Sequence, residues 1–172
     1  MKKPIAAILA NVLILISAQV YAAKPWNLKH EEVASFEAKV VDVLCELSGD
    51  CADNCGGGKR VLGLLKADGT LHLAVKGGNN FAGAVSDLIP HCGKSIEVDG
   101  LLIKNPLATI FFVQGVRTGP DVEWMDAKKF KEDWLVANPG GKDPWFRNDP
   151  VVKEIIEQDG VFGLPGVEPP AQ

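Results

Sequence analysis

RVLGLLKADGTLHLAV, residues 60–75, holds two apolar runs joined at Ala67-Asp68-Gly69. Asp-Gly between two such runs is the strongest short-range signal for a β-hairpin, because these residues accept the positive φ of a tight turn. The run before it, SFEAKVVDVLCEL (residues 35–47), is rich in β-branched and apolar residues and predicts one long strand. The three runs therefore predict three consecutive strands.

A short helix and two more strands follow the hairpin. FAGAVSDLIPHC (81–92) has apolar residues at helical spacing and predicts a helix that stops at Pro90. KSIEVDGLLI (94–103) alternates apolar and polar residues and predicts a strand with a bend at Gly100. LATIFFVQGVRT (107–118) predicts the fifth strand.

The order of these elements indicates a mainly β fold. Strand-strand-strand-helix-strand-strand is the layout of a five-stranded OB-like barrel, which we place at residues 23–118. An open five-stranded sheet with a helix on one face is the alternative, and the bend at Gly100 favours the closed barrel. Residues 119–172 contain two amphipathic segments, and we expect a C-terminal helical extension packed on the barrel.

The amino terminus has the three-part layout of a secretory signal peptide. Lys2 and Lys3 precede an apolar run, and Val20 and Ala22 occupy the −3 and −1 positions of a cleavage site. We therefore predict a signal peptide at residues 1–22 and a periplasmic location, with an uncleaved membrane anchor as the alternative. The rest of the chain, about 150 residues, has the size of one domain.

Charge and motifs restrict the function. The chain of 172 residues has a net charge of −4, so it has no electrostatic attraction to nucleic acid. It contains no G-x-S-x-G, H-E-x-x-H or P-loop motif.

The first interpretation is a non-enzymatic binding or accessory module with no stable membrane anchor after cleavage. Its partner would be another periplasmic protein, contacted through Trp134, Trp145 and Phe146.

Four cysteines lie at positions that the barrel topology brings to one end. The first and fourth strands of an OB barrel pair antiparallel, so Cys45 at the end of the first lies near Cys92 before the fourth. Disulfides are the default state of an exported protein. Three pairings are open, and the topology favours Cys45–Cys92, with Cys51–Cys55 closing the small loop.

Two other uses of these sulfurs remain open. The four cysteines and His91 supply thiolates and an imidazole, the ligands that suit copper(I) or zinc, and no other cofactor is implied. A thiol–disulfide redox protein is the second alternative, with Cys51–Cys55 as its reactive pair. Lys59 and Arg60 would lower the pKa of a thiol there.

Four motifs carry a resemblance to a known group. VVDVLC, CADNC, LGLLKADG and GKSIEVDG, between Val40 and Gly100, resemble a set of uncharacterised exported bacterial OB-fold-like domains with a Cys…Cys-x3-Cys…GLL…DG pattern. The resemblance covers roughly a third of the chain. In that group, more residues separate the first cysteine from the C-x3-C pair than separate Cys45 from Cys51. The resemblance implies an OB-like fold and a joint role for three cysteines, and no activity.

Overall fold

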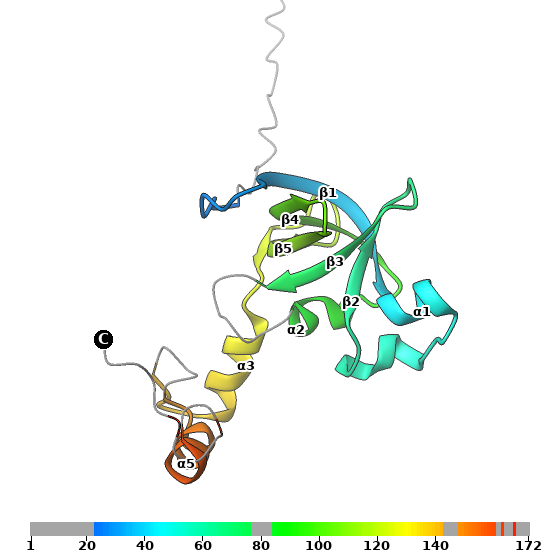
Figure 1. The fold of residues 1–172 in the computed structure, drawn as a ribbon. Coiled ribbons are helices and arrows are strands. Elements are labelled where there is room, and N and C mark those ends of the chain that lie inside the picture. The colour runs from blue at the N-terminus through cyan, green and yellow to red at the C-terminus, as the bar shows by residue number, and fades with distance from the viewer. Residues whose placement is uncertain (1–22, 77–83, 143–147, 161–162, 164–166, 168–172) are drawn as a thin grey trace, which may run out of the picture.

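A closed five-stranded β-barrel dominates the computed structural model, which describes residues 23–76, 84–142, 148–160, 163 and 167 (Figure 1). The strands follow the order β3-β2-β1-β4-β5, with antiparallel neighbours. A parallel pairing of β3 with β5 closes the barrel. This topology confirms the predicted OB-like fold. The five strands are β1 (Glu31–Asp42), β2 (Leu62–Leu65), β3 (Leu71–Lys76), β4 (Ser95–Asn105) and β5 (Ala108–Arg117).

The barrel interior is filled by the apolar residues that alternate along the strands. Successive side chains of a strand point to opposite faces, so one residue in two enters the core. Complete burial of such a side chain stabilises the fold by about 1.5–3 kcal/mol. The largest fully buried side chains are Phe111, Leu62, Leu64, Leu88, Leu101, Val40, Val98 and Val113.

The first strand ends earlier than the sequence predicts. β1 starts at Glu31 and stops at Asp42, and the next six residues form the helix α1 (Val43–Ser48). The carboxylate of Asp42 caps this helix by accepting the N–H of Leu44 at 2.9 Å. Gly49, with φ of 75°, ends it. The prediction of strand up to residue 47 is therefore wrong, because a short apolar run fits strand and helix equally well.

A short helix closes one end of the barrel between β3 and β4. It consists of α2 (Val85–Leu88) and the helical turn η2 (Ile89–His91). α2 thus stops two residues before Pro90, which lies inside the final turn. Residues 81–83 of the predicted helix lie outside the described part of the chain. Leu88 is fully buried, so the helix acts as a plug for the core.

The C-terminal extension begins inside the sheet. A two-residue strand, β6 (Met125–Asp126), pairs antiparallel with β5. The helix α3 (Lys129–Ala137) follows, and its first N–H donates to the carboxylate of Asp87 on α2 at 2.8 Å. The last helix, α5 (Pro150–Asp159), lies beyond α3 and away from the barrel (Figure 1). No helix in the described ranges is long and apolar enough to span a bilayer.

Candidate functional site

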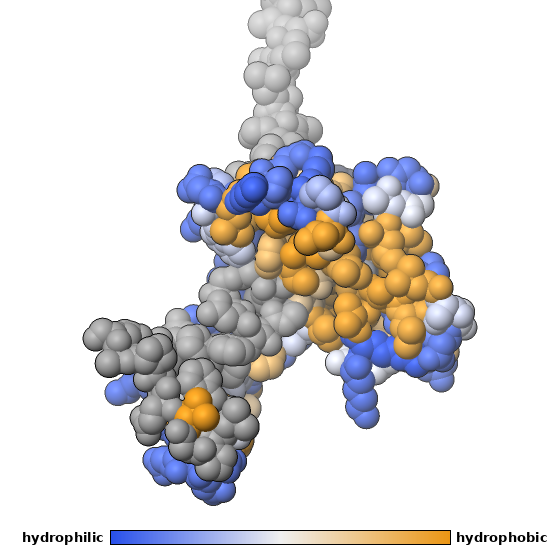
Figure 2. Space-filling model, viewed as in Figure 1, coloured by the Kyte–Doolittle hydropathy of each residue, from blue (hydrophilic) through white to orange (hydrophobic). Residues whose placement is uncertain are grey.

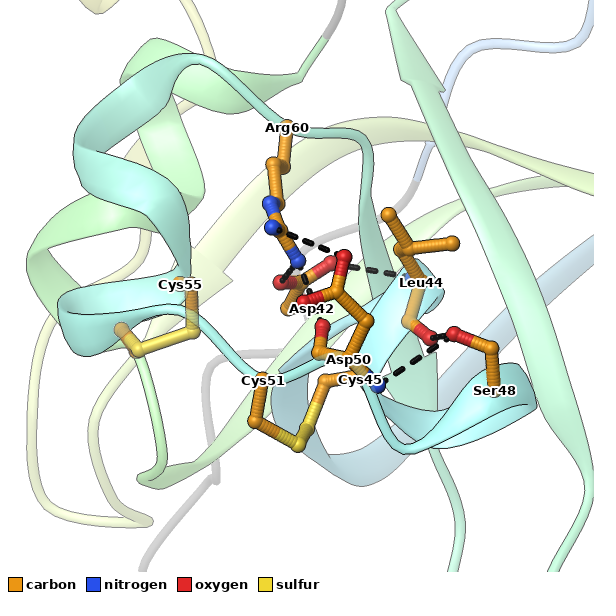
Figure 3. The surroundings of a disulfide bond; sticks show 9 residues. Asp42, Leu44, Cys45, Ser48, Asp50, Cys51, Cys55 and Arg60 are labelled. Atoms are coloured by element: carbon orange, nitrogen blue, oxygen red, sulfur yellow. Dashed lines mark hydrogen bonds and ion pairs between the residues drawn. A yellow bond between two sulfur atoms is a disulfide. The ribbon is translucent and has the colours of Figure 1, made fainter.

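All four cysteines form disulfides, three of them in the segment that joins β1 to β2 and the fourth, Cys92, in the turn just before β4. We call residues 43–61 the cystine loop. The bonds are Cys45–Cys51 and Cys55–Cys92, with Cα–Cα distances of 4.3 and 6.0 Å. The predicted pairing of Cys45 with Cys92 and of Cys51 with Cys55 is therefore wrong. Figure 3 shows the first bond beside α1 and Cys55 on the opposite branch of the loop.

The helix α1 explains the different pairing. Because the chain turns helical at Val43, Cys45 leaves the strand direction that would have carried it toward β4. The left-handed residue Gly49 then reverses the chain, which returns Cys51 to Cys45. The predicted closeness of Cys92 to β1 is correct, since the N–H of Gly93 donates to the carbonyl oxygen of Val40 at 2.9 Å. Cys55 is the cysteine that reaches it.

A run of left-handed residues directs Cys55 into the protein. Within the turn η1 (Asp53–Gly58), φ is 47° at Asn54, 50° at Cys55, 74° at Gly56 and 57° at Gly57. The left-handed conformation costs about 1–2 kcal/mol at a residue with a side chain, whereas glycine adopts it freely. Gly58, with φ of 84°, continues the run, so three of its five residues are glycines that adopt this conformation without strain. As a result, Cys55 is only 7% exposed and packs in the core cluster.

Arg60 ties the two ends of the cystine loop together. Its guanidinium contacts the buried carboxylate of Asp42 at 3.1 Å and that of Asp50 at 3.2 Å. It also donates to the backbone oxygen of Asp50 (Figure 3). The sequence predicts that Arg60 lowers the pKa of a nearby thiol. In the structure its charge is taken up by two carboxylates, and there is no thiol beside it.

The predicted copper or zinc site is not formed by the cysteines in this structure. Their sulfurs are bonded to one another, and a disulfide offers no thiolate for a metal ion. Over the described ranges, no three or more His, Cys, Asp or Glu side chains are grouped so that they could hold a metal. The predicted reactive pair, Cys51–Cys55, is likewise divided between two different disulfides.

His91 lines an open pocket between η2 and the C-terminal extension. Burial, with a smaller contribution from Lys94, lowers the pKa of His91, so its imidazole is neutral at pH 7. The pocket has a volume of about 590 Å³ and contains side chains of both charges. Its polar and aromatic lining includes Asp87, His91, Trp124, Lys128, Lys129 and Glu132. The sequence did not predict this pocket, because its walls come from segments far apart in the chain.

The barrel also carries a set of exposed apolar side chains beside the cystine loop. Leu44 and Leu47 on α1 are 46% and 73% exposed, Val61 is 59% exposed, and Leu73 on β3 is 36% exposed. We call these four residues the apolar face. Figure 2 shows a broad apolar surface over α1, β2 and β3. The sequence pattern does not predict this face, since apolar residues in strands usually indicate the core.

Close packing joins the α1 side of this surface to the β3 side. Gly63 on β2 lies under two side chains, because a Cβ built on it would meet Leu71 at 2.8 Å and Val43 at 2.9 Å. Leu73 is the direct β-partner of Gly63, and the N–H of Val43 donates to the carbonyl oxygen of Val61 at 3.1 Å. The missing side chain at Gly63 therefore lets α1 settle onto the sheet and makes the surface continuous.

The structure describes one of the three predicted partner-contact residues of the extension, Trp134. Trp134 is half-buried, its indole N–H donates to the carboxylate of Asp149, and its ring lies against Gly141. It thus fastens α3 to the start of α5. Trp145 and Phe146 lie outside the described residues.

Comparison of the chain with protein-family models, with curated proteins and with solved structures gives no match.

Proposed function

We propose that this protein is a periplasmic, non-enzymatic binding module that docks another exported protein on its apolar face. The observation that carries the proposal is the exposure of Leu44, Leu47, Val61 and Leu73 on one side of the barrel. Soluble monomers rarely leave a large contiguous apolar surface in water, and such surfaces commonly mark protein interaction sites.

The cystine loop presents its part of the apolar face in a fixed conformation. One disulfide closes the loop on itself, and the second joins it to Cys92 just before β4. Arg60, near the end of the loop, pairs with Asp42 immediately before its start and with Asp50 in its middle. A surface that is already ordered loses less conformational entropy when a partner binds. This bracing supports a docking role more than a catalytic one.

The chemistry of the surface supports a protein partner from an oxidising compartment. Nucleic acid is disfavoured by the net charge of −4 and by the apolar character of the face. The signal-peptide pattern and the two disulfides support export. The partner would therefore be an exported protein with exposed aliphatic or aromatic side chains of its own.

The experiment starts with the processed protein, purified from the periplasm with its disulfides intact. A partner captured by cross-linking is identified and purified, and its dissociation constant is measured directly. We expect the double variant Leu47→Ser/Val61→Ser to weaken binding at least tenfold. The matched control is Leu107→Ser in the β4–β5 turn, which is 94% exposed and outside the apolar face, and it should bind as the wild type does.

Two outcomes would overturn the proposal. Equal affinity of the double variant and the wild type would show that the partner binds elsewhere. A wild-type protein that sediments as a dimer, with the double variant a monomer, would show that a second copy of this chain occupies the apolar face.

A further inference from the structure

The first described residues are fixed along β5 by specific contacts. The N–H of Lys24 donates to the side-chain oxygen of Gln114 at 2.8 Å, and the Gln114 amide donates back to the carbonyl oxygen of Lys24 at 2.9 Å. The carboxylate of Glu31 accepts the N–H of Trp26 at 3.1 Å, and the Trp26 ring packs edge-on against Phe112. The backbone just after the predicted cleavage site therefore has a defined place on the barrel.

Ala23, the first residue of this segment, is buried beside an acidic side chain. Ala23 is 5% exposed and Asp99 on β4 is 2% exposed. The N–H of Ala23 and the hydroxyl of Ser35 on β1 both hydrogen-bond to the Asp99 carboxyl group. The atom Oδ1 of Asp99 is buried and has no hydrogen-bond partner among the described residues.

The structure provides no cation for this carboxyl group within the described residues. Burial raises the pKa of Asp99, and the hydrogen bonds from Ala23 and Ser35 only partly offset that effect. Charged side chains on the neighbouring elements pair with one another: Arg117 on β5 with Glu97 on β4 at 2.5 Å, and Lys128 with Asp126 on β6 at 2.6 Å. Lys24, next to Ala23, is exposed and does not contribute to the pKa of Asp99.

We propose that Ala23 and Asp99 form a maturation site, in which the amino terminus released by cleavage after Ala22 makes a buried ion pair with Asp99. This inference rests on the export step of the proposed function. Hydrolysis of the Ala22–Ala23 bond consumes one water molecule, leaves a carboxylate on the leader and frees the amine of Ala23. That amine takes up a proton at neutral pH, since the ordinary pKa of an α-amino group is about 7.7–8.0.

The new ammonium group fits the place of the amide that it replaces. The amide nitrogen of Ala23 has one N–H to donate, whereas the ammonium has three. The ammonium can therefore also donate to the unpartnered Oδ1 of Asp99. Hydrogen bonds between two charged groups are shorter and about twice as strong as those between neutral ones. Cleavage would thus supply the cation that this buried carboxyl group lacks, and the processed chain would be more stable than the unprocessed one.

The test measures the pKa of the α-amino group of Ala23 in the exported, disulfide-bonded protein. N-terminal sequencing first establishes the start of the processed chain, and the Cα and Cβ chemical shifts of Ala23 are then followed by NMR from pH 6 to 11. We expect a pKa at least one unit above the ordinary value, a tenfold gain in proton affinity that corresponds to about 1.4 kcal/mol. In Asp99→Asn the pKa should return to the ordinary range.

Two further variants keep the test decisive if Asp99→Asn folds poorly. A processed chain that starts with one extra glycine before Ala23 retains Asp99 but displaces the charge, and its amine should titrate with an ordinary pKa. The matched control is Asp87→Asn, which removes another buried carboxyl group and should leave the amine of Ala23 with its raised pKa. The inference is overturned by a processed chain that starts elsewhere, by an ordinary pKa in the wild type, or by an equal shift in Asp99→Asn.

The result is independent of partner binding. A raised amine pKa in a protein that binds no partner would refute the docking role alone. An ordinary pKa in a protein that binds its partner through the apolar face would refute the maturation site alone.

Discussion

Gly100 on β4 lies so close to β5 that a Cβ atom built on it would be 2.0 Å from the backbone oxygen of Phe112. The same atom would be 2.9 Å from the ring of Phe111, a fully buried core residue. The register between β4 and β5 shifts between Asp99 and Gly100. The bend that closes the barrel therefore depends on a residue without a side chain.

Gly100→Ala should destabilise the protein by about 3 kcal/mol or more, because β4 and β5 must separate to admit one methyl group. Urea denaturation of the disulfide-bonded protein gives the free energy of unfolding. Gly119→Ala is the control, since a Cβ at Gly119 would meet only Val122 at 4.0 Å, and it should change stability by less than about 0.5 kcal/mol. Similar unfolding midpoints for the two variants would contradict this prediction.

The two disulfides should differ in their contributions to stability. Cys45–Cys51 spans 6 residues of sequence and Cys55–Cys92 spans 37. By the chain-entropy relation the first stabilises the fold by about 2 kcal/mol and the second by about 4 kcal/mol. Thermal unfolding of Cys45→Ala/Cys51→Ala and Cys55→Ala/Cys92→Ala should show the larger loss in the second double variant. The opposite ranking would mean that the loop path, and not loop length, governs the effect.

The two bonds should also differ in their access to reducing agents. Cys51 is exposed, whereas Cys55 is 7% exposed and packed in the core. Under native conditions, dithiothreitol should therefore reduce Cys45–Cys51 first. Alkylation followed by peptide mass spectrometry identifies the thiols released at each time, and early labelling at Cys55 and Cys92 would contradict the expected order.

The fold could be predicted because its signals are local and mutually consistent. The Asp-Gly turn at Asp68 and Gly69 lies between two strands, and Gly100 marks the bend of β4. The end of β1 could not be predicted, since Val43 and Leu44 fit a strand pattern and only the cap at Asp42 makes them helical. The strand β6 could not be predicted either, because two residues are too few to show an alternation of apolar and polar side chains.

The disulfide pairing depends on the backbone path of the cystine loop. The spacing of the cysteines in the sequence does not determine that path. Topology correctly placed Cys92 near β1. It could not show that α1 would carry Cys45 away, or that left-handed residues from Asn54 onward would turn Cys55 inward. The apolar face was missed for a related reason, since a strand pattern does not show which apolar residues the barrel leaves uncovered.

His72 should make the protein less stable in mildly acidic solution. It is buried on β3, and burial, followed by the charge of Lys66, lowers its pKa from 6.5. A lowered pKa means that the unfolded chain binds a proton more readily, so stability is complete above pH 6.5 and falls as the pH drops below that value. The unfolding midpoint in urea should therefore be lower at pH 5.5 than at pH 7.5.

His72→Phe removes this titrating group and should reduce the difference between the two pH values. The pKa of His91 is also lowered, so His91 contributes to the same pH dependence of stability. The double variant His72→Phe/His91→Gln should remove both contributions. A pH dependence that is unchanged in the double variant would assign the effect to carboxyl groups.

The strand β6 gives the C-terminal extension a protective role in the sheet. β5 pairs with β3 from Ile110 to Val113, and beyond that point β6 covers Gly115 and Val116. A chain cut at residue 118 would expose this stretch of backbone as an open edge, and open edges recruit strands from other molecules. The smallest fragment that stays monomeric should therefore extend past Asp126. A chain cut at residue 118 would differ from the full chain through self-association as well as through the loss of α3 and α5.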